Sequence, residues 1–390
     1  MRKCLTALFI FLIVNGCKKP FTPELTSDNS RYLVIEGIIS GSSDSTFIRL
    51  SRTKKVDTLR TIYAETGAQL DVENDANNIY NLTEIRPGIY AMAPLNLDAS
   101  HKYRLRIKTA DNKEYLSEFV VVKNAPPIDS VGFIAKSDGV RVYVNSHDAA
   151  NTTRYYRWDY REDWQFHAQY ISGYYSNGVD SIKPRPVSQQ VYYCYGKDSS
   201  TNVLIASTNK LTQDIIYQAP MTLLPSTSEK IEKKYSVLVK QYALTSDAYD
   251  FWQDLQKNTE KLGSIFDVLP SQTVSNYRCV SNPNELVIGY LSVGNASSKR
   301  IYITADQLLP SYSPQYPAAC ELDTAFINPP HPGTRSIGEL IPYNSPYVPV
   351  SGLFLPPPSP FGGPTAYSYS TKFCVDCTLR GTTIPPSFWK

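Results

Sequence analysis

The stretch HKYRLRI at residues 101–107 alternates polar and apolar side chains. A period of two places every second side chain on the same face, which is typical of a β-strand with one buried face. Comparable strands are expected on both sides of it, at residues 32–39, 47–50, 68–73, 79–82, 89–92 and 118–122. About seven short strands at this spacing predict an N-terminal immunoglobulin-like β-sandwich over residues 31–125.

Two consecutive prolines after Ala125 mark the end of this domain, so residues 126–390 are expected to form a second β-rich domain. Its strongest strand signal is YYRWDYRE at residues 155–162. Alternation there places Tyr156 and Trp158 on one face, which predicts a core strand with a tryptophan at its centre. The fold class is therefore mainly β.

The second domain also carries one clear helix and a long proline-rich segment. The helix is predicted near residues 247–262, because Thr245 and Ser246 supply an N-cap and apolar side chains recur at helical spacing. Fourteen of the 28 prolines lie within residues 310–364, which excludes a regular helix or a central strand there. We expect this segment to wrap the domain as an ordered coil that cysteines pin in place.

The composition favours an extracytoplasmic protein. Tyrosine (29) outnumbers phenylalanine (14) and tryptophan (4) together, proline (28) outnumbers glycine (19), and charged residues make up only 19%. Lysine and arginine (39) nearly balance aspartate and glutamate (36), and a net charge of +3 excludes a strongly basic nucleic-acid binder. No nucleic-acid partner is expected.

The amino terminus predicts a lipoprotein. Residues 1–16 form a signal peptide in which Arg2 and Lys3 precede a short apolar run, and a cysteine follows it as in a bacterial lipobox. Cys17 is then the lipidated residue that anchors the protein to the membrane, and residues 17–30 are a tether. An ordinary signal peptide with an incidental cysteine is the alternative.

Apart from Cys4 in the signal peptide and Cys17, the chain has five cysteines: Cys194, Cys279, Cys320, Cys374 and Cys377. An oxidising compartment permits disulfides, and the odd number leaves one thiol free or the last two cysteines paired locally. A bridge from Cys320 to Cys374 or Cys377 is favoured, because it would tie the proline-rich segment. A redox motif or a zinc site is disfavoured at the Cys-x-x-Cys pair, since no helix is predicted there and no second ligand pair exists.

Catalytic and metal-binding motifs are not found. Four histidines are present, at least twenty residues apart: His101, His147, His167 and His331. No P-loop, nucleophile elbow or zinc-protease string occurs. Asp71, Glu73 and Asp75 alternate, and a solvated strand face is favoured over a calcium site. We expect no enzyme, no metal and no cofactor.

Aromatic side chains after residue 154 are the candidate binding surface. Tyrosine and tryptophan combine a large apolar area with a polar group, which suits sugars and peptides, although aromatic residues in strands are more often core. The residues proposed for such a surface are Tyr155, Trp164, Tyr174 and Tyr175.

Several segments together resemble a known family. These are the lipobox, LVIEG at residues 33–37, CVSNP at 279–283 with VIGY at 287–290, and the ending with Cys-x-x-Cys, Gly381 and PSFW at 386–389. They are similar to the Bacteroidota lipoproteins called domain of unknown function 4249. The resemblance implies an outer-membrane lipoprotein, often encoded beside a TonB-dependent receptor, with no established activity and no catalytic residues to transfer. In Bacteroidota lipoproteins, a short acidic signal after the lipidated cysteine is typical of export to the cell surface. Acidic residues are missing between Cys17 and Glu24, which favours the periplasmic face over the cell surface.

The function expected from the sequence is binding. The protein would be a non-enzymatic accessory of a TonB-dependent receptor in nutrient uptake, and its ligand would be a small molecule, a glycan or a peptide. A structural or adhesion lipoprotein of the cell envelope is the alternative. A polymer hydrolase is a third, which would need a pocket with converging carboxylates or a Ser–His pair.

Overall fold

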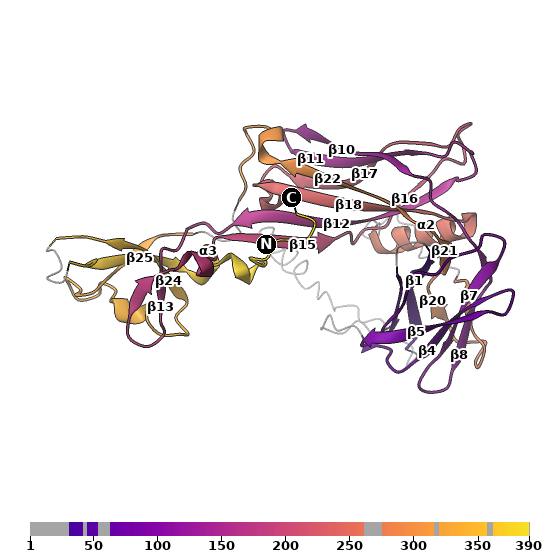
Figure 1. The fold of residues 1–390 in the computed structure, drawn as a ribbon, viewed down its shortest axis with the longest axis horizontal. Coiled ribbons are helices and arrows are strands. Elements are labelled where there is room, and N and C mark those ends of the chain that lie inside the picture. Colours follow the sequence, from indigo (N-terminus) through magenta and orange to yellow (C-terminus); the bar gives the residue numbers. More distant parts are fainter. Residues whose placement is uncertain are drawn as a thin grey trace, which may run out of the picture.

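The structure is a computed structural model, and it describes residues 31–41, 45–53, 63–260, 275–315, 320–356 and 362–389. The signal peptide, Cys17 and the tether lie outside these ranges. The described chain is mainly β, which confirms the predicted fold class. Figure 1 shows the N-terminal sandwich at the lower right, a larger central body above it, and an arm that projects to the left. None of the described helices is long and apolar enough to cross a membrane.

The N-terminal sandwich has two antiparallel layers that share one strand. Its strands are β1 (Leu33–Ser40), β2 (Thr46–Arg52), β3 (Tyr63–Ala64), β4 (Gln69–Asn74), β5 (Ile79–Arg86), β6 (Ile89–Met92), β7 (Lys102–Lys108), β8 (Glu114–Ser117) and β9 (Val120–Val121). β5 pairs with β4 through its first half and with β6 through its second, so it belongs to both layers. In β7 the predicted alternation is confirmed, because Tyr103, Leu105 and Ile107 are buried in the core between the layers.

Three strands from much later in the sequence complete this sandwich. β19 (Tyr277–Cys279) pairs with β8, whereas β20 (Val287–Ile288) and β21 (Ser292–Gly294) run parallel to β1. We call residues 277–294, which contain these three strands, the return segment. The predicted boundary, which assigned everything after residue 125 to the second domain, is wrong for this segment. Pairing between strands so distant along the chain leaves no local signal in the sequence.

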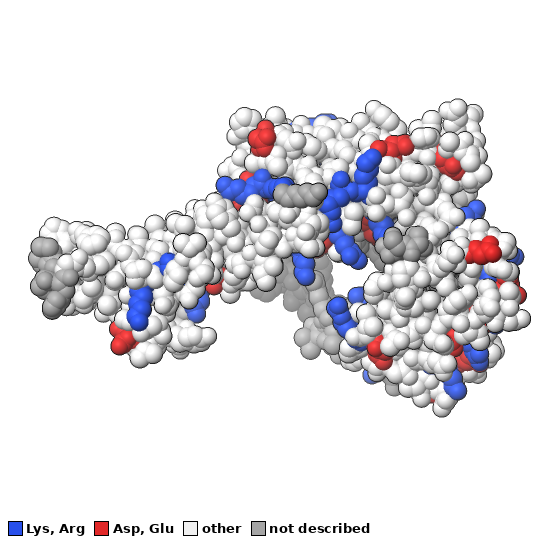
Figure 2. Space-filling model, viewed as in Figure 1, with Lys and Arg blue, Asp and Glu red and all other residues white. Residues whose placement is uncertain are grey.

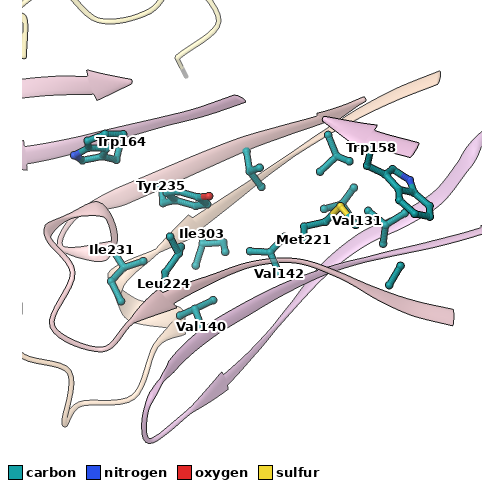
Figure 3. Close-up of a cluster of buried hydrophobic side chains, with 14 of the residues drawn as sticks. Val131, Val140, Val142, Trp158, Trp164, Met221, Leu224, Ile231, Tyr235 and Ile303 are labelled. Carbon is teal, nitrogen blue, oxygen red and sulfur yellow. The ribbon is translucent and has the colours of Figure 1, made fainter. Parts of the chain in front are cut away.

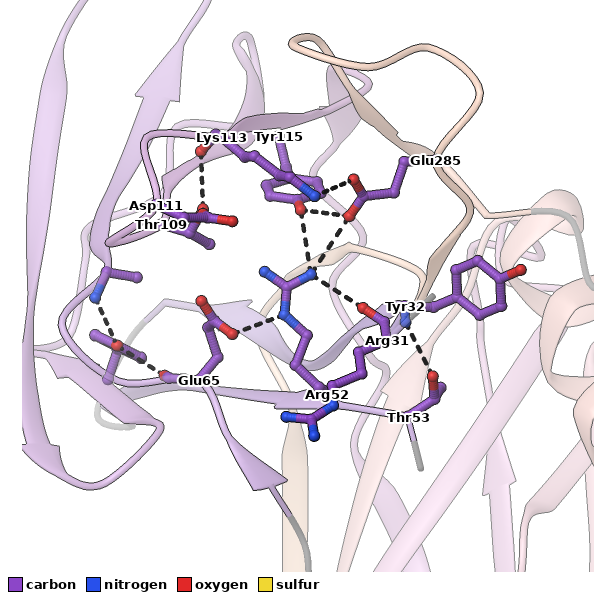
Figure 4. Close-up of polar contacts among 12 residues, drawn as sticks. Arg31, Tyr32, Arg52, Thr53, Glu65, Thr109, Asp111, Lys113, Tyr115 and Glu285 are labelled. Carbon is purple, nitrogen blue, oxygen red and sulfur yellow. Dashed lines mark hydrogen bonds and ion pairs between the residues drawn. The ribbon is translucent and has the colours of Figure 1, made fainter. Parts of the chain in front are cut away.

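A polar network around Glu285 fixes the return segment to the sandwich (Figure 4). The Glu285 carboxylate accepts hydrogen bonds from the Tyr115 hydroxyl at 2.6 Å and from Lys113 Nζ at 2.7 Å, and it pairs with Arg52 at 3.3 Å. Arg52 also pairs with Glu65 at 2.7 Å. Burial alone would raise the pKa of Glu285. The two hydrogen bonds and the charges of Lys113 and Arg52 outweigh it, so the pKa lies below its ordinary value.

We expect Glu285→Gln to destabilise the protein by roughly 2–3 kcal/mol at neutral pH, because charge-assisted hydrogen bonds to three partners are lost. A carboxylate with a lowered folded pKa stabilises the fold above its unfolded pKa, and the effect disappears as the pH falls through the folded value. The variant should therefore approach the wild type in acid. Denaturant unfolding at both pH values measures this, with Glu118→Gln, an exposed carboxylate of the same sandwich, as the control. Equal losses at both pH values would contradict the prediction.

The central body is a second two-layer assembly. Its strands are β10 (Ile128–Lys136), β11 (Gly139–His147), β12 (Tyr155–His167), β15 (Tyr193–Ser199), β16 (Leu204–Ser207), β17 (Ile215–Pro225), β18 (Lys234–Ala243) and β22 (Ser297–Thr304). A five-stranded sheet in the order β15-β12-β18-β22, with β16 beside β12, faces the three-stranded sheet β10-β11-β17. Figure 3 shows the core between them, with Trp158 and Tyr235 facing Val142 and Met221. The predicted core strand is confirmed, because Trp158 is only 1% exposed.

Helix α2 (Ser246–Glu260) connects the central body to the sandwich. The Thr245 hydroxyl accepts a hydrogen bond from the N–H of Ala248 at 3.2 Å and so caps the helix start. The ring of Phe251 lies 5.4 Å from that of Tyr290 in the return segment. The predicted helix is confirmed as far as Glu260, and its last two predicted residues lie outside the described ranges.

The arm is a small β structure. Its strands are β13 (Tyr174–Ser176), β14 (Ile182–Pro184), β23 (Asp323–Phe326), β24 (Tyr347–Leu353) and β25 (Ala366–Thr371). β25 lies between β23 and β24, and Pro349 sits beside a bulge in the edge strand β24, where a missing N–H is tolerated. The predicted wrapping coil is therefore wrong, because the proline-rich segment projects from the body (Figure 1). Proline is disfavoured only in the central strand of a sheet. The central strand of the arm is β25, which lies after the proline-rich segment.

Two disulfides hold the arm to the body. Cys320–Cys374 closes the base of the arm, which confirms the predicted bridge from Cys320 to the Cys-x-x-Cys pair. Cys194–Cys377 joins β15 to the turn after the four-residue helix α3 (Lys372–Val375), a helix that the sequence does not predict. Cys279 is buried in the sandwich as a free thiol.

After the second disulfide the chain returns to the body. Thr382 and Tyr195 exchange backbone hydrogen bonds at 2.7 and 3.0 Å, and the Trp389 ring lies 5.3 Å from the Tyr195 ring. A Cβ atom on Gly381 would lie 2.5 Å from the Tyr195 carbonyl oxygen, so only glycine permits this approach. The C-terminal ending thus covers one end of the outer face of the five-stranded sheet.

Candidate functional site

Two adjoining hollows lie where the sandwich meets the central body, with volumes of about 640 and 440 Å³. Both are lined by Phe47 of the sandwich and by Asp159, Arg161, Lys240 and Tyr242 of the body, so they form one continuous interdomain cleft. Volumes of this size are typical of small-ligand sites, and such sites often lie between domains. The interdomain cleft is therefore the candidate site.

The floor of the cleft is the outer face of the five-stranded sheet. The even-numbered residues of β12 point into the core, so Arg157, Asp159 and Arg161 lie on the outer face. The antiparallel register places Asp159 opposite Lys240 and Arg161 opposite Leu238 on β18. The strand pattern that builds the core thus also lines the floor with charged side chains.

Arg157 is held in one position by three neighbours. Its guanidinium lies 4.2 Å from the ring centre of Trp252 on α2 and 4.9 Å from that of Tyr242 on β18. It also donates a hydrogen bond to Asp159 at 2.5 Å. These contacts neutralise the charge of Asp159 and tie α2 to the floor, so we assign Arg157 a positioning role.

Two further cations face the cleft. Arg161 is exposed, and within the described residues its guanidinium has no hydrogen-bond or ion-pair partner. Lys240 occupies the diagonal position on the neighbouring strand. Figure 2 shows lysine and arginine side chains gathered along the margin of the body that faces the sandwich. Arg157, Arg161 and Lys240 outnumber the two carboxylates that line the cleft, Glu36 and Asp159, and this excess of positive charge favours an anion.

The sandwich forms the opposite wall, which is largely apolar. Val34 and Ile38 of β1 and the half-exposed ring of Phe47 line it. The acidic residue on this wall, Glu36, lies directly opposite Arg49 in the β1–β2 pair, so the wall carries one charge of each sign there. The cleft therefore combines a cationic floor with an apolar wall.

The return segment closes one end of the cleft. Tyr290 packs against Phe251 of α2, and burial raises the pKa of the Tyr290 phenol above its ordinary value. This phenol therefore keeps its proton at neutral pH and adds no negative charge to the cleft.

The four aromatic residues proposed for a binding surface do not come together. Trp164 is only 8% exposed and belongs to the core of the body, so its assignment to a surface is wrong. It lies six residues after Trp158, and an even spacing puts both on the same face of β12. Tyr155 lies at the start of β12, and Tyr174 and Tyr175 lie on β13 in the arm.

The other candidate residues have structural partners. Each cysteine of the Cys-x-x-Cys pair is in a separate disulfide, which excludes a local bond between them. Asp71 is buried and accepts a hydrogen bond from Asn81 at 2.6 Å, and Glu73 is buried against Arg104, so the predicted solvated face is wrong for both. Within the described residues no group of three or more His, Cys, Asp or Glu side chains could hold a metal ion. The predicted lipidation at Cys17 lies outside the described residues.

The cleft residues Arg161, Lys240 and Trp252 are not among the residues that the sequence singles out. Alternation along residues 155–162 does place the arginines on the face away from Trp158. It carries no information about the sandwich that covers this face.

Two solved structures are similar to parts of the chain. A segment of two fibronectin type-III domains from chicken tenascin is 10% identical, covers 54% of this chain and 90% of that chain, and has a TM-score of 0.15. Chitinase ChiA74 from Bacillus thuringiensis is 11% identical and also has a TM-score of 0.15. The match covers 47% of this chain and 30% of the chitinase chain. At these TM-scores neither carries an argument about the present chain. No curated protein matches it.

A family model matches residues 18–300, from the tether to β22. The match includes the sandwich, the return segment and the strands of the cleft floor, and it stops before the proline-rich segment and the C-terminal ending. Because it covers well over half of the chain, this protein belongs to the family described as domain of unknown function (DUF4249).

Proposed function

We propose that this protein is a lipid-anchored binding protein of the outer membrane, which holds a ligand in the interdomain cleft and acts with a TonB-dependent receptor in nutrient uptake. The interdomain cleft carries the proposal, because it joins a cationic floor to an apolar wall in a volume suited to a small ligand. The lipobox ending at Cys17 supports the anchor. The lack of acidic residues between Cys17 and Glu24 favours the periplasmic face over the cell surface. The family resemblance supports the receptor partner.

The lining of the cleft favours binding over catalysis. Among the described residues that line it there is no histidine or cysteine, so no Ser–His or Cys–His pair faces a ligand. Two carboxylates, Glu36 and Asp159, do line the same hollow, which is the one observation that favours a glycan hydrolase as a second candidate. Asp159, however, is engaged by Arg157. Release of reducing ends from a bound oligosaccharide, abolished by Glu36→Gln, would favour that candidate instead.

We expect a TonB-dependent receptor to co-purify with the intact lipoprotein from detergent-solubilised outer membranes. The protein carries a tag after Lys390, and mass spectrometry identifies and quantifies its partners. Cys17→Ala, which removes the lipidation site, is the matched control, and it should lower the recovery from the membrane fraction. Recovery of the lipidated protein without a receptor would overturn the uptake role and favour a structural or adhesive lipoprotein.

A further inference from the structure

The interdomain cleft changes from apolar to polar along its length, and this gradient points to a class of ligand, an inference that rests on the binding function proposed above. We propose that the ligand is an anionic amphiphile with a hydrocarbon tail. The tail lies in the smaller hollow, between the sandwich and α2. The carboxylate or phosphate head binds Arg161, which lines both hollows.

The apolar wall of the smaller hollow is built from cross-strand pairs. Ile288 lies beside Val34 in the parallel β1–β20 pair, and Phe47 lies opposite Ile38 in the antiparallel β1–β2 pair. All four line this hollow, yet Phe47 is 53% and Ile288 is 37% exposed. A hydrocarbon chain that lies against this wall would remove apolar surface from water, which is favourable.

Helix α2 supplies further apolar surface to the same hollow. Phe251, Trp252 and Leu255 line it, and a spacing of three and four residues places them on one face of the helix. Tyr290 of the return segment packs on Phe251, with ring centres 5.4 Å apart. The sandwich and α2 thus both contribute apolar side chains, which suit a hydrocarbon chain and offer a sugar few hydrogen-bond partners.

The larger hollow is polar, and Arg161 lies where the two hollows adjoin. Four serines line the larger one: Ser45, Ser199, Ser200 and Ser298. Among the described residues of the smaller hollow, Arg161 is the cation without a hydrogen-bond or ion-pair partner. Arg157 binds Asp159, and Lys240 is already engaged, with its Nζ 5.8 Å from the ring centre of Tyr242. An anionic head on Arg161 gains charge-assisted hydrogen bonds at the polar end while its tail is buried at the apolar end.

Calorimetric titration of the full-length Cys17→Ala protein tests this class. The variant removes the predicted lipid anchor, so the titration needs no detergent, which would compete with an amphiphilic probe. The probes are laurate, dodecyl phosphate, butyrate and dodecyl maltoside, each below the concentration at which it forms micelles. Butyrate shares the carboxylate of laurate but has a short tail. Dodecyl maltoside has a tail of the same length as laurate but a neutral head.

We expect laurate or dodecyl phosphate to bind, and these two probes distinguish a carboxylate head from a phosphate head. Butyrate should bind at least about a hundredfold more weakly, because each buried methylene contributes to affinity. Dodecyl maltoside should bind about tenfold or more weakly, because it forms no charge-assisted hydrogen bond. Arg161→Gln should remove the preference for an anionic head. Ile288→Thr should weaken every long-chain probe, and Phe47→Ser is the second tail variant if Ile288→Thr fails to fold.

Each variant has a matched control. Arg141 pairs with Asp138 on the three-stranded sheet outside the interdomain cleft, so Arg141→Gln controls for the loss of an arginine. Ile79 is an exposed isoleucine on β5 that does not line the cleft, so Ile79→Thr controls for the loss of an apolar strand residue. Both controls should leave the affinities unchanged.

Four results would each overturn the proposal. They are no binding of either anionic long-chain probe, equal affinity for butyrate, equal affinity for dodecyl maltoside, and anionic binding that Arg161→Gln or the tail variant leaves unchanged. Receptor capture by the intact lipoprotein separates the two levels. If capture succeeds while the anionic amphiphiles fail to bind, the ligand class is wrong and the accessory function stands. If they bind as expected without receptor capture, the uptake role is wrong and the amphiphile site stands.

Discussion

Trp158→Ala is expected to cost about 3–5 kcal/mol of stability, because it removes the largest fully buried side chain of the central body and leaves a cavity between the two sheets. A second term adds to this loss. The Trp158 Nε1–H donates to the Gln241 side-chain oxygen at 2.8 Å, and Gln241 in turn donates to the Pro126 carbonyl oxygen and the Ser146 hydroxyl, each at 2.9 Å. Removal of the indole leaves a buried acceptor on Gln241 without its donor.

Trp158→Phe separates the two terms. It retains most of the ring volume, leaves a smaller cavity and loses the hydrogen bond, so it should cost about 1–3 kcal/mol. Chemical denaturation followed by circular dichroism measures both variants. If Trp158→Ala unfolds at the same midpoint as the wild type, or if both variants fold normally but lose ligand binding, Trp158 is a site residue and not a core residue.

The sequence predicts the fold best where one strand face is buried. In β7 and β12 a period of two identifies both the strand and its buried side, because solvent and core impose opposite chemistry on alternate residues. The pattern fails where pairing is remote. β20 and β21 are only two and three residues long, and they pair with β1 from more than 250 positions away along the chain. Proline content predicts what the arm cannot be, but it does not reveal the sheet that the arm forms.

The interdomain cleft could be predicted only in part. The alternation that buries Trp158 also assigns Arg157 and Arg161 to the opposite face. What the sequence lacks is the second wall. β1 and β2 form the outside of a separate domain, and their position over β12 and β18 is set by α2 and by the return segment. For Trp164 the alternation was correct and the assignment to a surface was wrong. Its aromatic character suggested a binding surface, but its even spacing from Trp158 places it in the core.

Loss of the Cys194–Cys377 disulfide, by Cys194→Ser together with Cys377→Ser, is expected to cost about 2–5 kcal/mol. The bond joins residues 183 apart and so closes a loop that contains the arm strands β23, β24 and β25, which removes much entropy from the unfolded chain. Both sulfurs are also buried in the core of the central body, so serine would bring polar hydroxyls into it. Hydrogen exchange should quicken at Tyr195 and Thr382, whose backbone pairing this bond holds in place.

The matched control is Cys320→Ser with Cys374→Ser. This bond spans 54 residues, and its cysteines pack with Val350 and Val375 at the base of the arm, away from the main core. Its loss should speed exchange in the arm while the central body keeps its protection, because proteins open in local units that share few contacts. Two indistinguishable exchange patterns would contradict this division. The distinction matters for function: the first disulfide supports the sheet whose outer face is the floor of the interdomain cleft, so only its loss should weaken ligand binding there.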